Sequence, residues 1–215
     1  LAQARGRRVV FLDSDDWVAP AFLERLHAAL DAAPGAAAAY CDRQRVMPDG
    51  ALAPVQSDPR IAQAPLDAFA RSCAVAIHAV LVERAQVLGA GGFEPALRTC
   101  EDWDLWQRIA RLGGRWVHVA EPLAFYRTSA DSLSQDMDQL LADASVVVHR
   151  GFGVDPRLRA AGDAPIARAS CAHGMTPEIA LAYLALWCGA VDATRGREHA
   201  RVKAPLAVLP AHRDH

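Results

Sequence analysis

An apolar run that ends in a cluster of carboxylates constrains this chain more than any other feature. Residues 9–12 are continuously apolar, and Asp13, Asp15 and Asp16 follow directly. A short apolar run bounded by polar residues predicts a buried β-strand. In open α/β sheets, ligand sites lie beyond the carboxyl ends of the strands. The run therefore predicts an α/β fold with a polar site just after this strand.

Two of these carboxylates have the spacing of a metal site. In an extended chain the side chains of Asp13 and Asp15 point to the same side, because strand side chains alternate with a period of two. Two carboxylates converging on one point suit a hard cation such as Mg²⁺ or Mn²⁺, which would in turn hold phosphate oxygens. The alternative is a solvated turn, or a set of caps for the next helix. The segment alone leaves both interpretations open.

The composition narrows the class of protein. With 215 residues, 52% hydrophobic and 22% charged, the chain can form one sizeable domain, or one domain with an appendage. A net charge of −2 gives no sign of a nucleic-acid partner or of a polybasic membrane patch. The five cysteines are scattered and form no CxxC pair, which argues against a disulfide framework or zinc site and predicts a cytoplasmic location. The longest apolar stretch, 179–191, is too short to span a bilayer, although peripheral contact with a membrane stays compatible with it.

Hydrophobic periodicity and turn residues predict the remaining elements. The chain begins with Leu1 and reaches its first strand almost at once, so we expect earlier strand–helix units of the sheet to be missing. The expected strands are 9–12, 36–41, 75–82, 115–119 and 123–127, with a hairpin formed by 43–47 and 51–55 and a loop over 57–64. The expected helices are 20–33, 66–72, a brief one ending at Gly89, 101–112, 133–149 and 177–191.

A second acidic site is expected at the start of the helix over 101–112. Asp102 shares a face with Leu105, Trp106 and Ile109, which should be the buried face. A carboxyl on the first turn of an inward stripe is unusual, and the helix dipole there favours its anionic form, as suits a general base. Alternatively, Thr99 and Asp102 form an approximate capping box, and the carboxyl only satisfies backbone N–H groups.

The neighbouring polar residues have weaker signals. Glu101 and Asp104 fall off the apolar face and are expected to be positioning or solvated groups. Arg127 ends an expected strand, and Ser132 and Ser134 follow it. Such a segment can bind phosphate oxygens through charge-assisted hydrogen bonds. Either serine could equally be the N-cap of the next helix.

Taken in order, these motifs resemble the family 2 glycosyltransferases of GT-A fold, over about residues 1 to 135. The motifs are Phe-Leu-Asp-Ser-Asp-Asp-Trp at 11–17, Gly-Gly-Phe at 91–93, Glu-Asp-Trp-Asp-Leu-Trp at 101–106, and Tyr-Arg at 126–127 with Ser132 and Ser134. The resemblance implies a mixed α/β sheet flanked by helices. Residues 1–135 would be the C-terminal part of a GT-A domain, and 136–215 a mostly helical extension with a mobile tail. The strands that bind the donor's base and ribose would precede residue 1, on the order of 60–90 residues at about 30 per unit.

The resemblance also implies an activity, which is metal-dependent, inverting transfer of a sugar from a nucleotide-diphospho-sugar to a hydroxyl of a glycan, a lipid-linked or another acceptor. Asp13 and Asp15 would be the DxD pair. Asp15 would ligate Mn²⁺ or Mg²⁺, and Asp13 would join it or hold the donor ribose. Asp102 would be the base. The residues implied near the donor diphosphate are Arg127 and Ser132, and those on the acceptor side are Gly92, Glu101 and Trp103.

Two rival functions are set against this one. The first is a haloacid-dehalogenase-like phosphatase, with Asp13 as nucleophile and Asp15 as general acid. That family wants a Thr or Val soon after the second Asp and a downstream lysine, whereas Asp16 and Trp17 follow here and the sole lysine, Lys203, lies in the tail. The second is a catalytically impaired fragment or a sugar-binding remnant.

Overall fold

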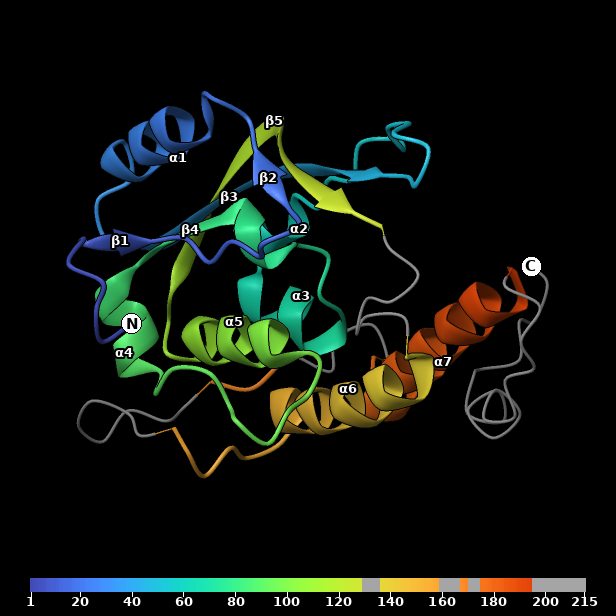
Figure 1. The fold of residues 1–215 in the computed structure, drawn as a ribbon. Coiled ribbons are helices and arrows are strands. Elements are labelled where there is room, and N and C mark those ends of the chain that lie inside the picture. The colour runs from blue at the N-terminus through green and yellow to red at the C-terminus, as the bar shows by residue number, and fades with distance from the viewer. Residues whose placement is uncertain (129–135, 159–166, 170–174, 195–215) are drawn as a thin grey trace, which may run out of the picture.

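A computed structural model of the chain describes residues 1–128, 136–158, 167–169 and 175–194. Its centre is a five-stranded mixed sheet in the order β1-β4-β3-β5-β2 (Figure 1). Strands β3 and β5 pair in parallel, and the other named pairs are antiparallel. The bounds are β1 Arg8–Val9, β2 Trp17–Val18, β3 Ala36–Val46, β4 Val80–Glu83 and β5 Arg115–Arg127.

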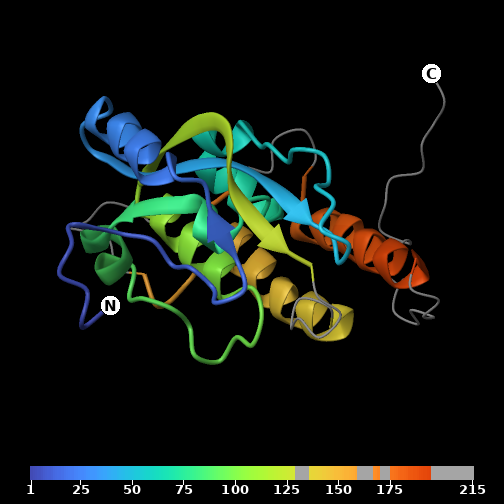
Figure 2. The same ribbon diagram turned by 45° about the horizontal axis from the view of Figure 1, so that its top comes forward.

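Helices cover both faces of this sheet. Helix α1 lies on one side, and α3 and α5 lie on the other, with α6 and α7 packed beyond them (Figure 2). In the described ranges, no helix is both long and apolar enough to cross a membrane. The helices are α1 Phe22–Asp31, α2 Arg60–Gln63, α3 Pro65–Arg71, α4 Arg84–Gly89, α5 Glu101–Arg111, α6 Met137–Phe152 and α7 Pro177–Thr194, with the 3₁₀ turn η1 Ile77–Ala79 before β4.

The first strand is shorter and more exposed than expected. Only Arg8–Val9 joins the sheet, at its edge, where it pairs with β4. Val10 is half-buried and Leu12 is 53% exposed, so the prediction of a buried strand through residue 12 is wrong. The apolar run does predict burial. After Val9, however, that burial comes from side chains packing against the core, because the backbone no longer pairs with β4.

Several other bounds differ for identifiable reasons. The expected strands 36–41 and 43–47 form one strand, β3, and 115–119 and 123–127 form one strand, β5. The register of this pair shifts where Asp42 faces Pro122, because proline has no N–H to give to the ladder. Helix α2 lies in the expected loop, the short strand β2 was not expected, and β4 begins only after η1.

Helix α5 is buried on all sides. Leu105, Trp106 and Ile109 are fully buried against the sheet, as expected. Asp104 is also fully buried, so of the two expectations for it, a positioning or a solvated group, the second is wrong. The reason is that α6 and the residues after it cover the outer face of α5. Its buried polar residues are Asp104, Gln107, Arg108 and Arg111.

Three arginines compensate the charge of Asp104. Its carboxylate lies 2.8 Å from Arg108, 2.7 Å from Arg157 and 3.3 Å from Arg150. Arg108 also donates to the carbonyls of Ala90 and Gly92. This ion cluster therefore joins α5 to the turn before it and to the chain that follows α6.

We expect Asp104→Ala to destabilise the fold strongly. Removing the carboxylate leaves the buried Arg108 without its counterion, a change that typically costs about 3–5 kcal/mol. Urea unfolding would measure the free energy of unfolding. The exposed Glu24→Ala in α1 is the control, with an expected change within about 0.5 kcal/mol. A loss for Asp104→Ala no larger than that of the control would contradict the role given to the cluster.

Candidate functional site

The acidic cluster after β1 is a turn and not an extended strand. The Asp16 N–H donates to the carbonyl of Asp13 at 3.2 Å, with Ser14 and Asp15 as the central residues. The expectation that Asp13 and Asp15 share a side through strand alternation is therefore wrong in its geometry. Both residues are exposed, and no group in the described part of the chain donates a hydrogen bond to either carboxylate.

The third carboxylate, that of Asp16, anchors the turn. Its side chain is only 2% exposed, and it lies 2.9 Å from Nδ1 of His78 in η1. It also accepts a hydrogen bond of 2.8 Å from the Arg127 N–H at the end of β5. His78 escaped the sequence reasoning, although a lone polar residue within the apolar run 75–82 was a visible signal.

Arg127 lies directly at this turn. Its Nε donates to the carbonyl of Asp15 at 2.9 Å. The guanidinium stands over the ring of Trp17, 5.1 Å from the centroid, and Trp17 stacks on Phe125 at 5.6 Å. A fixed cation therefore lies beside the two exposed carboxylates. Ser132, the other residue implied near the diphosphate, lies outside the described residues, as does Ser134.

A cavity next to the turn brings the two acidic motifs together. It has a volume of about 480 Å³, and Asp13 and Glu101 are among the residues that line it. These residues come from the turn after β1 and from the first turn of α5. The apolar lining residues are Val10, Phe11, Leu12, Ile77 and Phe93.

The entry into α5 has an unusual backbone. Cys100, the N-cap, has φ +60°, the left-handed region. The capping box with Thr99 does not form, because Thr99 bonds to Asp143 of α6 instead. The Asp102 carboxylate accepts one hydrogen bond, of 2.7 Å, from the Trp103 N–H. Capping thus engages one oxygen of Asp102.

The environment of Asp102 raises its pKa to about 7. Burial is the main cause, and the negative charges of Glu101 and Asp13 add to it, while the Trp103 N–H and the charge of Arg43 oppose it. Burial likewise raises the pKa of Asp13 and that of Glu101. A carboxyl with a pKa near neutrality can exchange a proton at physiological pH, and such groups gather at functional sites. Arg43, in β3, gave no signal in the sequence.

Two residues expected on the acceptor side have structural roles here. Trp103 is 3% exposed, and its Nε1 donates to the carbonyl of Phe69, so its burial does not fit contact with an acceptor. Gly91 and Gly92 have φ of +86° and +72°, which an L side chain rarely adopts. Gly92 thus permits the tight turn that leads from α4 towards Phe93 and the cavity.

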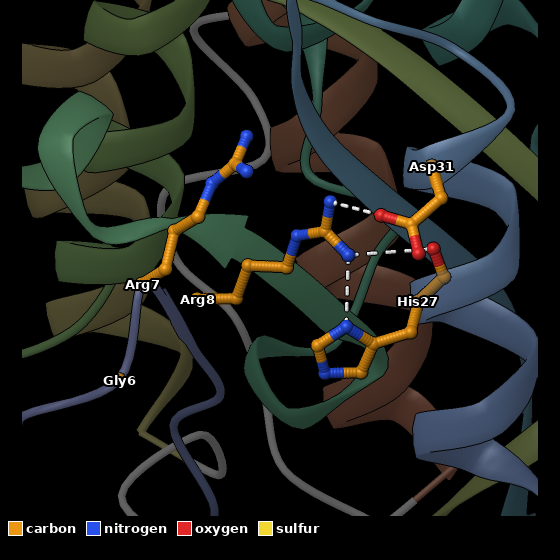
Figure 3. A pocket seen from close by; sticks show the side chains of 5 residues that line it. All are labelled: Gly6, Arg7, Arg8, His27 and Asp31. Atoms are coloured by element: carbon orange, nitrogen blue, oxygen red, sulfur yellow. Dashed lines mark hydrogen bonds and ion pairs between the residues drawn. The ribbon is translucent and has the colours of Figure 1, made fainter.

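A second cavity, of about 420 Å³, lies where β1 meets α1 (Figure 3). Arg8 fills its centre, donating to Asp31 at 2.6 Å, to His27 at 2.8 Å and to Glu83 at 2.9 Å. Its positive charge is thus already matched by two carboxylates. The contacts of Arg8 in this cavity join β1, β4 and α1. Among the residues that line the cavity, no buried cation is left without a carboxylate and so able to bind an anion.

The residues present suit a divalent cation only in part. In the described residues, no group of three or more His, Cys, Asp or Glu side chains is placed to hold a metal ion. Asp13 and Asp15 offer two oxygen ligands, and their mutual repulsion contributes to the raised pKa of Asp13. Mg²⁺ is commonly held by one or two carboxylates, with water and substrate phosphates completing its shell. The pair fits that role.

Comparison with known proteins identifies the family and the fold of the chain. A family model described as "Glycosyltransferase like family 2" matches residues 1–145. Residues 1–349 of TarS from S. aureus share its fold, with 16% identity and a TM-score of 0.52 over 91% of this chain and 50% of that one. The mannosyltransferase PcManGT from Pyrobaculum calidifontis, in complex with GDP-Man and Mn²⁺, gives 16% identity and a TM-score of 0.51 over 96% of this chain and 55% of that one.

These likenesses confirm the expected GT-A-like α/β fold. The chain spans about half the length of the two solved proteins. No curated protein sequence matches it.

The raised pKa of Asp102 predicts a specific pH dependence of stability. Since the native pKa is about 7 and an unfolded Asp titrates near about 3.9, the folded state binds the extra proton between these values. This group therefore lowers stability as pH rises from about 4 to about 7. We expect Asp102→Asn to remove that loss, so that its stability advantage over the wild type grows across this range.

Urea unfolding at a series of pH values measures the difference. Gln3→Ala, at an exposed position and without an ionisable group, is the control and should give a difference that does not vary with pH. A flat difference for Asp102→Asn as well would contradict the ionisation assigned to it.

Proposed function

Because the chain belongs to the glycosyltransferase-like family 2, we propose that it carries out metal-dependent transfer of a sugar from a nucleotide-diphospho-sugar to an acceptor hydroxyl, with inversion at the anomeric carbon. One observation supports this most. Asp13, which belongs to the exposed turn that Arg127 binds, lines the same cavity as Glu101 at the acidic start of α5. Sugar transfer needs a group that stabilises the negative charge of the leaving diphosphate and a group that takes the proton of the acceptor hydroxyl.

The turn after β1 would receive the donor diphosphate. Asp15 would ligate Mn²⁺ or Mg²⁺, and Asp13 would join it or hold the donor ribose. The bound cation would neutralise charge on the departing nucleoside diphosphate. Asp16 holds the turn so that both carboxylates face outward, and Arg127 supplies a second positive charge. On the basis of the family motif, Ser132 is also assigned to the residues near the donor diphosphate. The Mn²⁺ in the PcManGT complex is consistent with Mn²⁺ as the metal here.

The start of α5 would receive the acceptor. Asp102 is the proposed base, because a carboxyl with a pKa of about 7 can take a hydroxyl proton at neutral pH. Glu101 lines the cavity, and Gly92 shapes the turn that leads to it. We assign both Glu101 and Gly92 to the acceptor side. Attack by the activated hydroxyl from this end, opposite the diphosphate, would invert the anomeric carbon.

We predict that Asp102→Asn abolishes transfer while sparing donor binding. Loss of a positioned base typically costs about 10²- to 10⁴-fold in kcat. Glu101→Gln, which changes the neighbouring carboxyl, is the comparison and should cost less than about 10-fold. The readout is the release of nucleoside diphosphate by the full chain from a panel of UDP- and GDP-sugars.

Donor affinity, measured by calorimetry, should stay within about threefold for both variants. Unchanged turnover in Asp102→Asn, or a larger loss in Glu101→Gln, would overturn the assignment of the base. Donor binding without turnover in the wild type would support the sugar-binding remnant instead.

We predict that Asp15→Asn weakens the metal-assisted binding of the donor. An amide is a neutral and weaker ligand for a hard cation than a carboxylate. Titration of Mn²⁺ in the presence of GDP or UDP should give an affinity at least about 10-fold lower. Asp49→Asn, in the exposed turn before residue 50, is the matched control and should bind Mn²⁺ as the wild type does. Equal Mn²⁺ affinity in Asp15→Asn and in the control would refute the ligand role.

A further inference from the structure

A carboxylate on α6 holds the loop that leads into α5. Oδ2 of Asp143 accepts hydrogen bonds from the Thr99 N–H at 2.9 Å, the Thr99 hydroxyl at 2.9 Å and the Arg98 N–H at 3.1 Å. One turn earlier, the Leu140 carbonyl accepts from the Cys100 thiol at 3.8 Å. Two consecutive turns of α6 therefore hold the three residues that precede α5.

Asp143 is built to accept these bonds as an anion. Its side chain is buried, with 7% exposed. Burial by itself would raise its pKa, but the hydrogen bonds from the Thr99 N–H, the Gln139 side chain, the Thr99 hydroxyl and the Arg98 N–H outweigh burial and lower the pKa. Hydrogen bonds to an ionised acceptor are roughly twice as strong as neutral ones. The loop is thus held by charge-assisted bonds.

The held loop contains a strained residue. Cys100 has φ +60°, and among the described residues it is the one non-glycine with positive φ. A left-handed conformation is unfavourable for a residue with a side chain, and it persists where the surroundings over-determine it. The carbonyl of Cys100 accepts the first hydrogen bond of α5, of 2.9 Å, from the Asp104 N–H. The conformation of Cys100 thus sets the direction of the first helical turn.

We propose that Asp143 is a positioning residue for the transfer reaction: through Thr99 it fixes the left-handed Cys100, and so it directs Asp102 and Glu101 towards the side of Asp13. The inference rests on the proposed function, in which Asp102 is the base. Asp143 does not line the cavity, so it acts through the loop and not on substrate. Its effect is on the orientation of the base relative to the donor site.

The docking of α6 has other sources. Ala144, Val147 and Val148 of α6 belong to the hydrophobic core, and Gln107 of α5 donates to the Val147 carbonyl at 3.0 Å. Loss of the Asp143 carboxylate should therefore leave α6 docked and release only the loop. A positioning role can in this way be separated from a purely structural one.

The test compares three variants of the full chain. Asp143→Ala removes the acceptor, and Asp143→Asn retains one oxygen that can accept from Thr99. Asp136→Ala is the matched control, because it removes the side-chain N-cap of α6, which accepts from the Gln139 N–H at 3.0 Å, without touching the loop. Losing an N-cap weakens a helix, so the control reproduces a general weakening of α6.

The first readout is independent of activity. Backbone NMR shifts and amide exchange of residues 98–102 report the loop. We expect Asp143→Ala to shift the Cys100 signals and expose the Thr99 amide to exchange. We expect Asp136→Ala to leave both as in the wild type, with changes confined to the start of α6.

The second readout is the division between kcat and KM. Misplacement of a catalytic group by about 1 Å can cost on the order of 10²-fold. We expect Asp143→Ala to lower kcat on the order of 10- to 100-fold with the donor KM within about twofold. Asp143→Asn should recover part of this loss, and Asp136→Ala should show none.

The outcomes separate the two claims. An unaltered loop, an unaltered kcat, or a kcat loss equal to that of Asp136→Ala overturns the positioning role while the wild type still transfers sugar. Absence of transfer by the wild type overturns the proposed function itself, and the inference with it. A shifted loop together with a kcat-specific loss that Asp143→Asn relieves establishes the role.

Discussion

The site depends on one electrostatic arrangement, the burial of Asp104 among arginines. Its carboxylate is fully buried and lies within 2.8 Å of both Arg108 and Arg157. An unpaired charge would be very costly there, so the arginines make possible the complete burial of α5. Because Arg108 also binds the Gly92 carbonyl, the same cluster fixes the turn before α5. The first turn of α5, which carries Glu101 and Asp102, is thus held both by the ion pairs of Asp104 and by the hydrogen bond from Arg108 to the turn before the helix.

The fold could be predicted wherever the buried residues are apolar and recur with the period of a helix or a strand. The stripe Phe22, Leu23, Leu26 and Leu30 predicts α1, and all but Leu23, which is 53% exposed, are buried. The inward stripe of α5 was likewise visible. Prediction failed where polar groups are buried by partners distant in the chain. The outer face of α5 reads as solvated, but Arg111 donates to the carbonyls of Arg150 and Gly153. Periodicity also cannot show which neighbours a strand has, so β1 looked longer than it is.

The sequence motifs named candidate site residues, but they did not predict the geometry of those residues. They indicated Asp13 and Asp15 as a carboxylate pair, and Asp102 as an acid on an inward face. They did not indicate that a turn, and not strand alternation, places the first two. That turn depends on Asp16 meeting His78, more than sixty residues away, at 2.9 Å. Likewise, Thr99 appeared to cap α5, while its bonds go to Asp143, 44 residues further on. Contacts at such separations leave no trace in local pattern.

We propose that the turn after β1 and the start of α5 form one site around a divalent cation. Broadening of the NMR signals of the isotope-labelled full chain by Mn²⁺, added with a nucleoside diphosphate, tests this directly. We expect the strongest broadening at residues 13–16, then at Glu101, Asp102 and Arg127, with little effect at Asp49. Broadening that is absent from residues 13–16, or that is strongest in another acidic region such as Glu94 and Asp155, would contradict it.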